Sequence, residues 1–273
     1  MCGRYSASRS AADLVQAFRA DEVDGLDEVN DEELAASWNV APTDSVYAVL
    51  ERPPRGEPDA TPRRLLRVVR WGLVPSWAKD PKIGTRLINA RVETLADKPA
   101  FRKAFASRRC VLPADGYYEW YDPMAGDEAP SGRGKPRKQP FFIRPRDDGI
   151  LALAGLYELW RDDERGRDDP RAWLWTATVI TTEATDDLGR IHDRMPMFLE
   201  ADQVDAWLDP ARTDAEDLRR LLVPAAPGRL EAYPVSLAVG NVKNDEPSLV
   251  EPIPADESLV AVAPPPPAAD ALF

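Results

Sequence analysis

Short apolar runs separated by proline and glycine dominate the chain, and this pattern predicts many short strands rather than long helices. Branched and aromatic residues gather in these runs, as is typical of β-strands bounded by turns. We predict strands at Val46–Leu50, Leu65–Leu73, Cys110–Leu112, Tyr117–Tyr121, Phe141–Arg144, Leu151–Trp160, Ala172–Thr182 and Leu230–Val235.

Helical patterns are fewer, and each is short. Apolar spacing indicates a helix over Leu14–Arg19, which follows Ser10, and two more over Ala201–Leu208 and Ala215–Leu222. The acidic run Asp21–Glu33 lacks such spacing. We therefore predict a loop insertion or a frayed helix there.

The order of these elements indicates the fold class. Strands with scattered helices, and no regular alternation of strand and helix, predict an α+β fold: a single domain with a mainly antiparallel, barrel-like sheet and peripheral helices. No repeat or linker divides the chain. We place the domain at residues 1–240, and an irregular, proline-rich C-terminal tail that includes Pro264–Pro267 at residues 241–273.

Few residues in the chain can bind metals or form disulfides. The 273 residues include two cysteines, Cys2 and Cys110, and one histidine, His192. These numbers exclude a disulfide scaffold and a zinc site built from Cys/His clusters, and we expect no cofactor. No apolar run approaches the roughly 20 residues of a membrane helix, and the first residues lack the apolar stretch of a secretory signal. We therefore expect a cytoplasmic protein.

Charge is distributed unevenly along the chain. The net charge of −12 disfavours binding to polyanionic nucleic acid. Residues 61–110, however, carry thirteen Lys/Arg against three Asp/Glu, a local charge of +10, whereas the regions on either side are negative. Only seven of the 35 basic residues are lysine, as in the acid-rich proteins of halophiles. The basic segment is either a solvated face or a surface that binds phosphates.

Cys2 follows the initiator methionine directly. Removal of Met1 would leave an α-amine and a thiol on one residue, with reference pKa values of about 8 and about 8.5. An aldehyde condenses with such an amine to a Schiff base, and the sulfur then closes onto the imine carbon to give a thiazolidine. A cysteine can also occupy this position by chance, so the motifs elsewhere in the chain must show whether Cys2 is functional. Cys110, at the start of an apolar strand, is interpreted as a core thiol.

Seven segments carry long motifs: MCGRY at the N-terminus, WNVAPT (38–43), WGLVPSWAKD (71–80), INARVET (88–94), KPAFR (98–102), RRCVLPADGYYEW (108–120) and IHDRMP (191–196). In this order they resemble the SRAP family, the SOS response-associated peptidases, which are abasic-site processing proteins. The resemblance covers the chain from Cys2 to about Val235. It implies capture of the ring-opened aldehyde of an abasic site in single-stranded DNA as a thiazolidine crosslink, after removal of Met1.

The resemblance assigns four catalytic residues. Cys2 matches the family nucleophile. Asn89 matches an asparagine that donates to the opened sugar or orients the amine; alternatively, it caps a turn. Glu119 matches a glutamate for proton transfer, whose pKa desolvation between aromatic residues should raise; alternatively, it faces outward from a strand. His192 matches a histidine that handles protons at the imine or the sugar, although most single histidines are structural.

Candidates for holding DNA surround these four residues. Three arginines each lie two residues after a catalytic candidate, so in an extended segment the two side chains share a face. Tryptophans in the basic segment could stack on bases, or belong to the core. The resemblance suggests that the proline of the APT turn wedges near the lesion, and a threonine of TTEAT could donate to a phosphate or end a strand. These candidates are Arg4, Pro42, Trp71, Trp77, Arg91, Thr181 and Arg194.

These features predict a monomeric DNA-damage protein, associated with the nucleoid, that binds abasic sites in single-stranded DNA and crosslinks to them through Cys2. We also predict three further activities: crosslink reversal, strand cleavage by β-elimination and autoproteolytic removal of Met1. Two alternatives stay open. One is an N-terminal-nucleophile peptidase that uses Cys2, Glu119 and His192 on other proteins. The other is a non-covalent module for single-stranded DNA in which Cys2 is incidental.

Overall fold

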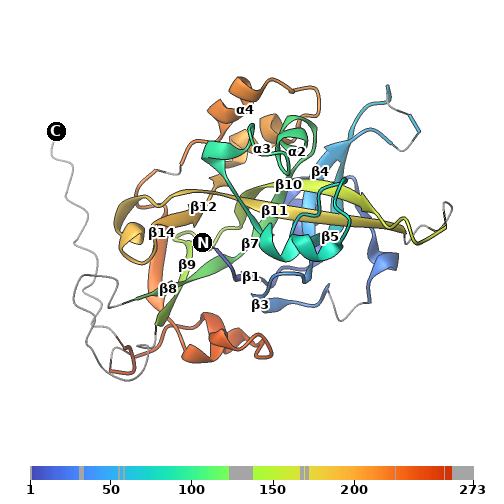
Figure 1. Ribbon diagram of the computed structural model, residues 1–273. Coiled ribbons are helices and arrows are strands. Elements are labelled where there is room, and N and C mark those ends of the chain that lie inside the picture. The colour runs from blue at the N-terminus through green and yellow to red at the C-terminus, as the bar shows by residue number, and fades with distance from the viewer. Residues whose placement is uncertain are drawn as a thin grey trace, which may run out of the picture.

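The computed structural model (Figure 1) describes residues 2–30, 34–54, 56–57, 59–122, 138–166, 169, 172–224, 226–254 and 256–259. Strands form most of the regular structure in these ranges, and the helices are short and peripheral. No helix within them is long and apolar enough to cross a membrane.

Five strands close into a barrel: β4 (Ser45–Arg52), β5 (Arg63–Trp71), β7 (Arg109–Ala114), β10 (Leu151–Arg161) and β11 (Trp173–Glu183). β4 pairs antiparallel with β5 and β7, β7 pairs with β10, and β10 pairs with β11. β11 then runs parallel to β5 through Thr176 and Ala177. This last pairing closes the ring.

Both faces of the barrel strands are buried, which explains their nearly continuous apolar sequences. In β4, Val46, Ala48 and Leu50 pack in the barrel interior. Val49, which points the other way, packs in a second cluster under the helices. A strand buried on both faces carries apolar residues without strict alternation.

A second, entirely antiparallel sheet lies against the barrel. Its strands, in spatial order, are β14 (Leu230–Pro234), β9 (Gln139–Pro145), β8 (Gly116–Tyr121), β1 (Tyr5–Ala7) and β3 (Ser37–Val40). β7 and β8 are separated by a single residue, so the chain passes directly from the barrel into this sheet. The N-terminal strand β1 lies between β8 and β3.

Four very short strands extend the sheets. They are β2 (Glu22–Asp24), β6 (Asn89–Arg91), β12 (Arg194–Pro196) and β13 (Phe198–Leu199). β2 and β6 run parallel to β5 and β11, whereas the other two pair antiparallel with their neighbours. The predicted α+β fold with a mainly antiparallel, barrel-like sheet is therefore confirmed, because only three strand pairings of the described residues are parallel: β2 with β5, β6 with β11 and β5 with β11.

Four short α-helices cover the outer face of the barrel: α1 (Ala11–Phe18), α2 (Arg102–Ser107), α3 (Ala201–Leu208) and α4 (Ala215–Leu221). α1 begins with a capping box, in which Ser10 and Asp13 satisfy each other's backbone N–H groups. The last three helices gather on one side of the barrel in Figure 1. Trp207 of α3 is fully buried there, and its Nε1 donates to the carbonyl of Cys110 at 2.9 Å.

The buried Arg109 joins the ends of two of these helices. Its guanidinium donates to four backbone carbonyls at the C-terminal ends of α2 and α3, those of Phe105, Ala106, Trp207 and Asp209. Such carbonyls have no partner within their own helix, and a cation at this end is favourable. Burial lowers the pKa of Arg109 to about 10, which leaves it charged at neutral pH.

The acidic run Asp21–Glu33 is more ordered than the predicted loop or frayed helix. It contains β2 and a 3-10 helix, η1 (Leu26–Glu28), and residues 31–33 lie outside the described ranges. Arg67 of β5 is buried and forms ion pairs with Asp24 and Glu28. The acidic residues therefore neutralise a buried cation, which a reading of the segment by itself does not reveal.

The chain continues to pack beyond residue 240. Two 3-10 helices, η7 (Leu237–Gly240) and η8 (Pro247–Val250), lie on the outer face of the second sheet. Leu249 is buried there in a cluster with Tyr118 and Phe142. The run Pro264–Pro267 lies outside the described residues.

Candidate active site

Strand β6 holds Asn89 beside the N-terminus of the chain. β6 lies parallel to β11 with Asn89 opposite Val179. The Nδ2 of Asn89 donates a hydrogen bond of 2.6 Å to the backbone carbonyl of Cys2. Its Oδ1 is buried and has no hydrogen-bond partner within the described chain. Asn89 therefore orients the Cys2 backbone and keeps an acceptor oxygen for another donor.

The Cys2 side chain lies in the apolar interior rather than at the surface. It is 0% exposed and belongs to the same cluster as Tyr5, Tyr117 and Trp71. Burial raises the pKa of the Cys2 thiol well above its usual value, and the charge of Glu119 raises it further. The sulfur is therefore protonated at neutral pH and would need an acceptor for its proton when it reacts.

Strand β8 brings Glu119 toward Cys2. β8 pairs with β1 in the register that places Tyr5 opposite Tyr117, and Tyr118 N–H donates to the carbonyl of Arg4 at 2.9 Å. Glu119 is only 3% exposed. Burial raises its pKa to about 7, in agreement with the direction expected from its aromatic neighbours. A carboxyl group with this pKa can both donate and accept a proton near neutral pH.

His192 precedes β12, which pairs with β11 next to the β6 contact. The backbone N–H of Arg194 donates to its Nδ1 at 2.9 Å, and the same nitrogen lies 2.9 Å from Oδ1 of Asp193. Burial lowers the pKa of His192. The negative charge of Asp193 opposes this shift, and the same charge raises the pKa of Glu119. Both groups are therefore within electrostatic reach of Asp193.

The four residues predicted as catalytic thus come from distant parts of the sequence to one place. β11 positions Asn89 and His192 through β6 and β12, whereas β1 and β8 position Cys2 and Glu119. One residue of this neighbourhood was not predicted. Tyr117 is buried beside Cys2 and Glu119, whose charges raise its pKa after the larger effect of burial. The GYYEW motif contains both Tyr117 and Glu119, but the family resemblance assigns a catalytic role only to Glu119.

Arg194 and Thr181 form a buried network behind His192. Arg194 binds both carboxylate oxygens of Glu93, at 2.6 and 3.1 Å, and donates to the Thr181 carbonyl at 2.7 Å. Arg194 and Thr181 are both buried, and the hydrogen bond from Arg194 lowers the pKa of Glu93. In this structure they are engaged with protein groups, and Arg194 positions His192 rather than facing solvent.

Arg4 is likewise engaged within the protein, through Asn39 of the WNVAPT motif. Arg4 Nη1 donates to Asn39 Oδ1 at 2.6 Å and to the Val239 carbonyl at 2.9 Å. The Nδ2 of Asn39 contacts the carbonyls of Val239, Asn241 and Asn244. Asn39, which was not predicted as important, therefore joins β1 and β3 to the segment that follows η7.

Replacing Asn39 by alanine should lower the free energy of unfolding by about 3 kcal/mol, because it removes the buried side-chain hydrogen bonds of Asn39 to Arg4 and to three backbone carbonyls. Urea unfolding measures this change. The matched control is Asn241→Ala on the exposed loop, where we expect a loss below about 1 kcal/mol. Equal losses in the two variants would contradict the role of Asn39.

Pro42 lies in a tight turn that rests on Trp71. The turn has Pro42 second and Thr43 third, with Thr43 at φ 82°, and Asp44 N–H bonds back to the Ala41 carbonyl at 3.1 Å. This is the geometry of a type II turn, which usually has glycine at the third position. Thr43 N–H also donates to the Trp71 carbonyl at 2.8 Å, so the turn is fixed to β5.

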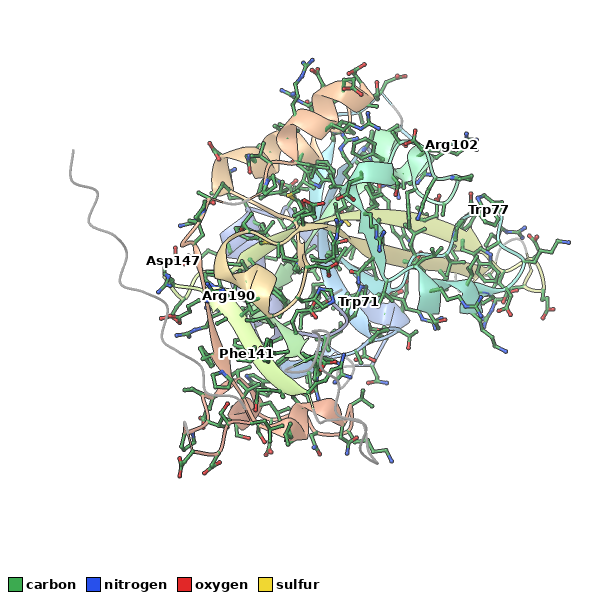
Figure 2. The ribbon with its side chains drawn as sticks, turned by 60° about the vertical axis from the view of Figure 1, so that its left-hand side comes forward. Trp71, Trp77, Arg102, Phe141, Asp147 and Arg190 are labelled. Atoms are coloured by element: carbon green, nitrogen blue, oxygen red, sulfur yellow. The ribbon has the colours of Figure 1, made fainter. Side chains whose placement is uncertain are left out.

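The two candidate tryptophans lie in different environments. Trp71 is 0% exposed, packs edge-on against Tyr5 and donates from Nε1 to the Ile88 carbonyl at 3.0 Å. Its position is that of a core residue. Trp77 is 58% exposed, and Figure 2 shows it at the edge of the molecule with Arg102 on the same side of the view. Trp77 is therefore the one of the two whose ring a base can reach.

The basic segment 61–110 divides into two groups. Five of its arginines are engaged by protein groups, in ion pairs or at helix ends: Arg63, Arg64, Arg67, Arg108 and Arg109. The other eight form no ion pair with another described residue. They are Arg70, Lys79, Lys82, Arg86, Arg91, Lys98, Arg102 and Lys103. Arg91 is exposed and ends β6, the strand that begins with Asn89.

Comparison with known proteins assigns the family. The model of the SOS response associated peptidase (SRAP) family matches residues 1–242. The chain belongs to the SRAP family. It is 38% identical over 253 residues to the abasic site processing protein YoqW of Bacillus subtilis, covering 92% of this chain and 99% of that protein. It is 31% identical over 280 residues to the abasic site processing protein HMCES of Gallus gallus, covering 93% and 78%.

Solved structures share the SRAP fold seen here. A crystal structure of a Bacteroides thetaiotaomicron protein superposes with a TM-score of 0.72 at 23% identity, covering 92% of this chain and all of that one. A Bordetella bronchiseptica protein superposes with a TM-score of 0.63 at 24% identity, covering 86% and 100%. In this SRAP chain, the described residues include no group of three or more His, Cys, Asp or Glu that could hold a metal ion.

Proposed function

We propose that this SRAP protein processes abasic sites in single-stranded DNA and, once Met1 is removed, forms a covalent crosslink to them through Cys2. The observation that carries this proposal is the hydrogen bond from Asn89 to the Cys2 backbone carbonyl, together with the buried Glu119, whose charge raises the pKa of the Cys2 thiol. The names of the relatives support the abasic site as the target.

The proposed chemistry requires two bonds to Cys2. The α-amine attacks the aldehyde carbon of the ring-opened sugar, and loss of one water gives the imine. The thiol sulfur then adds to the imine carbon, and its proton passes to the nitrogen, which closes the thiazolidine. Because the buried thiol is protonated, its proton must be accepted as the carbon–sulfur bond forms. Reversal follows the same steps backwards.

Each neighbouring residue has a proposed role in these steps. Glu119, with a pKa near 7, protonates the leaving oxygen and accepts protons from the amine and the thiol. Asn89 orients the Cys2 backbone and offers its buried Oδ1 to the amine or to a sugar hydroxyl. His192, neutral at pH 7, assists proton transfer at the sugar. The same imine would permit β-elimination of the 3′ phosphate.

Single-stranded DNA would approach over the exposed part of the basic segment. Phosphates bind to its unpaired lysines and arginines, and Trp77 stacks on a base. Trp77→Ala should therefore weaken binding of an intact single-stranded oligonucleotide about tenfold, as measured by fluorescence anisotropy. The matched control is Trp173→Ala, a partly exposed tryptophan on β11 beside Trp175. An equal loss in the control would refute a specific role for Trp77.

One experiment separates the proposal from its alternatives. The full-length protein is incubated with an oligonucleotide whose single uracil has been excised, and the products are separated under denaturing conditions. We expect an adduct whose mass equals the protein without Met1 plus the DNA minus one water. Intact DNA should give none. Binding without an adduct would support the non-covalent module, and cleavage of unrelated peptides without an adduct would support the peptidase.

A further inference from the structure

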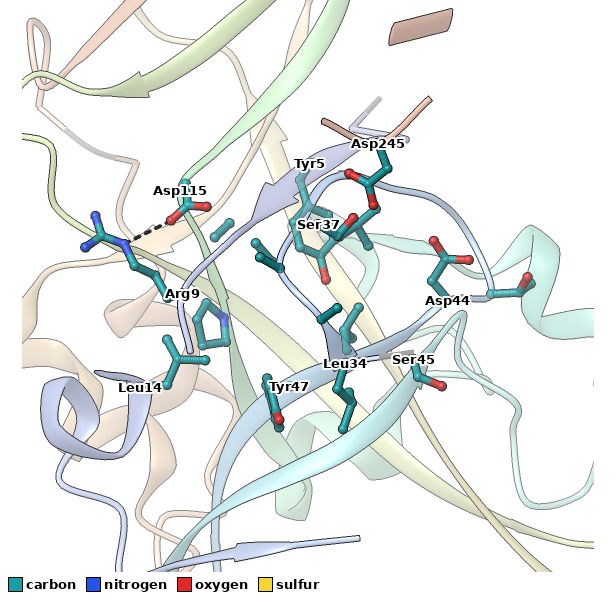
Figure 3. Close-up of a pocket in the computed structure, with 18 residues that line it drawn as sticks. Tyr5, Arg9, Leu14, Leu34, Ser37, Asp44, Ser45, Tyr47, Asp115 and Asp245 are labelled. Carbon is teal, nitrogen blue, oxygen red and sulfur yellow. Dashed lines mark hydrogen bonds and ion pairs between the residues drawn. The ribbon is translucent and has the colours of Figure 1, made fainter. Parts of the chain in front are cut away.

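A cavity of about 360 Å³ lies beside β1. It is bounded by β1, the β3–β4 turn and the start of α1, as Figure 3 shows. None of the four catalytic candidates is among its lining residues. Its volume lies in the range of pockets that bind small molecules.

The floor of the cavity contains a buried hydroxyl group without a partner. Tyr5 is 0% exposed, and its Oη makes no hydrogen bond within the described chain. In Figure 3 its ring extends from β1 into the middle of the lining residues. A buried hydroxyl that forms no hydrogen bond is unfavourable, and a ligand in the cavity would supply the missing partner.

Two carboxylates face each other at the mouth of the same cavity. Asp44 and Asp245 approach from separate loops (Figure 3), and each accepts one backbone hydrogen bond, from Ala41 N–H at 2.8 Å and Trp38 N–H at 2.6 Å. Burial raises the pKa of Asp44, Arg4 lowers it, and Asp245 raises it. The two carboxylates repel each other.

The remaining charges of the lining do not neutralise this pair. Asp115 is already bound by Arg9 at 3.1 Å and by the Ser8 backbone N–H at 2.6 Å. The lining therefore has three acidic residues and one basic residue, a net charge of −2. Apolar side chains cover the rest of it, including Leu14, Leu34, Val40 and Val46.

We propose that this cavity binds a small organic cation, an alkyl- or arylammonium compound, between Asp44, Asp245 and the hydroxyl of Tyr5. An ammonium group has three N–H donors, and the two carboxylates and the phenol oxygen offer three acceptors. The apolar lining accommodates the hydrocarbon part of the ligand. Charge-assisted hydrogen bonds to carboxylates favour this class over neutral compounds of the same shape. The proposal is independent of the crosslinking reaction.

Isothermal titration calorimetry with benzylamine as the probe tests this proposal. We expect binding with a Kd on the order of 1 mM or tighter at low salt, weakened by added NaCl. Benzyl alcohol and benzoate, which match its shape without the positive charge, should bind at least about tenfold more weakly. Equal binding of benzyl alcohol would overturn the proposal.

Variants locate the binding site. Asp44→Asn and Asp245→Asn should each weaken benzylamine binding about tenfold, and Tyr5→Phe about threefold. Asp163→Asn, an exposed carboxylate remote from the lining, is the matched control and should bind benzylamine as the unchanged protein does. Circular dichroism confirms folding of each variant. Unchanged affinity in both folded aspartate variants would refute the assignment.

Discussion

Replacing Cys2 by alanine is expected to abolish the denaturation-resistant adduct with abasic DNA, with a loss of at least roughly a hundredfold in adduct yield. The variant keeps an α-amine after Met1 removal, so the imine still forms. Without the sulfur, however, no thiazolidine ring can close, and the imine hydrolyses when the protein is denatured. Borohydride should therefore trap an adduct of Cys2→Ala by reducing that imine, whereas the unchanged protein needs no reductant.

Cys110 provides the matched control. It is also fully buried, and burial raises the pKa of its thiol as it does for Cys2. It belongs to β7 and pairs with Gly155 in the barrel, so its reactivity is unrelated to the N-terminus. Cys110→Ala should keep the adduct. Loss of the adduct in Cys110→Ala with retention in Cys2→Ala would reject the proposed nucleophile.

The sequence predicted the strands that are long and apolar. The runs Val46–Leu50 and Leu151–Trp160 lie within β4 and β10. Strands of three residues, such as β1, β6 and β12, were not predicted, because so short a segment has no measurable period. These strands nevertheless hold the candidate site, since β6 carries Asn89. Long-range pairing, rather than local sequence, makes them strands: β6 and β12 pair with β11, and β1 pairs with β3 and β8.

Burial was the main property of the site that sequence patterns could not supply. The motifs predicted a set of site residues around Cys2, but they did not separate exposed groups from groups buried inside the protein. Arg194 and Trp71 have the chemistry of DNA-binding residues and lie inside the protein. Both depend on partners distant in sequence, Glu93 and Ile88. A local motif contains no information about such partners.

Glu119→Gln should slow crosslink formation about a hundredfold near pH 7, because glutamine keeps the shape of the side chain but cannot transfer a proton. The unchanged protein should show a break in the pH–rate profile near 7, from the raised pKa of Glu119, and the variant should lose that break. Affinity for intact single-stranded DNA should stay nearly constant. A large loss of affinity would indicate a structural role instead.

The same substitution should stabilise the folded protein, and only at higher pH. The pKa of Glu119 is raised from 4.5 to about 7 by burial, so the unfolded chain loses this proton first as the pH rises. Stability therefore falls between pH 4.5 and 7, by on the order of 3 kcal/mol, and stays lower above that range. Glutamine carries no such proton. Urea unfolding should find Glu119→Gln more stable than the unchanged protein at pH 8 and nearly equal to it at pH 4.5. The same difference in unfolding free energy at both pH values would show that the Glu119 carboxyl is not buried in its neutral form.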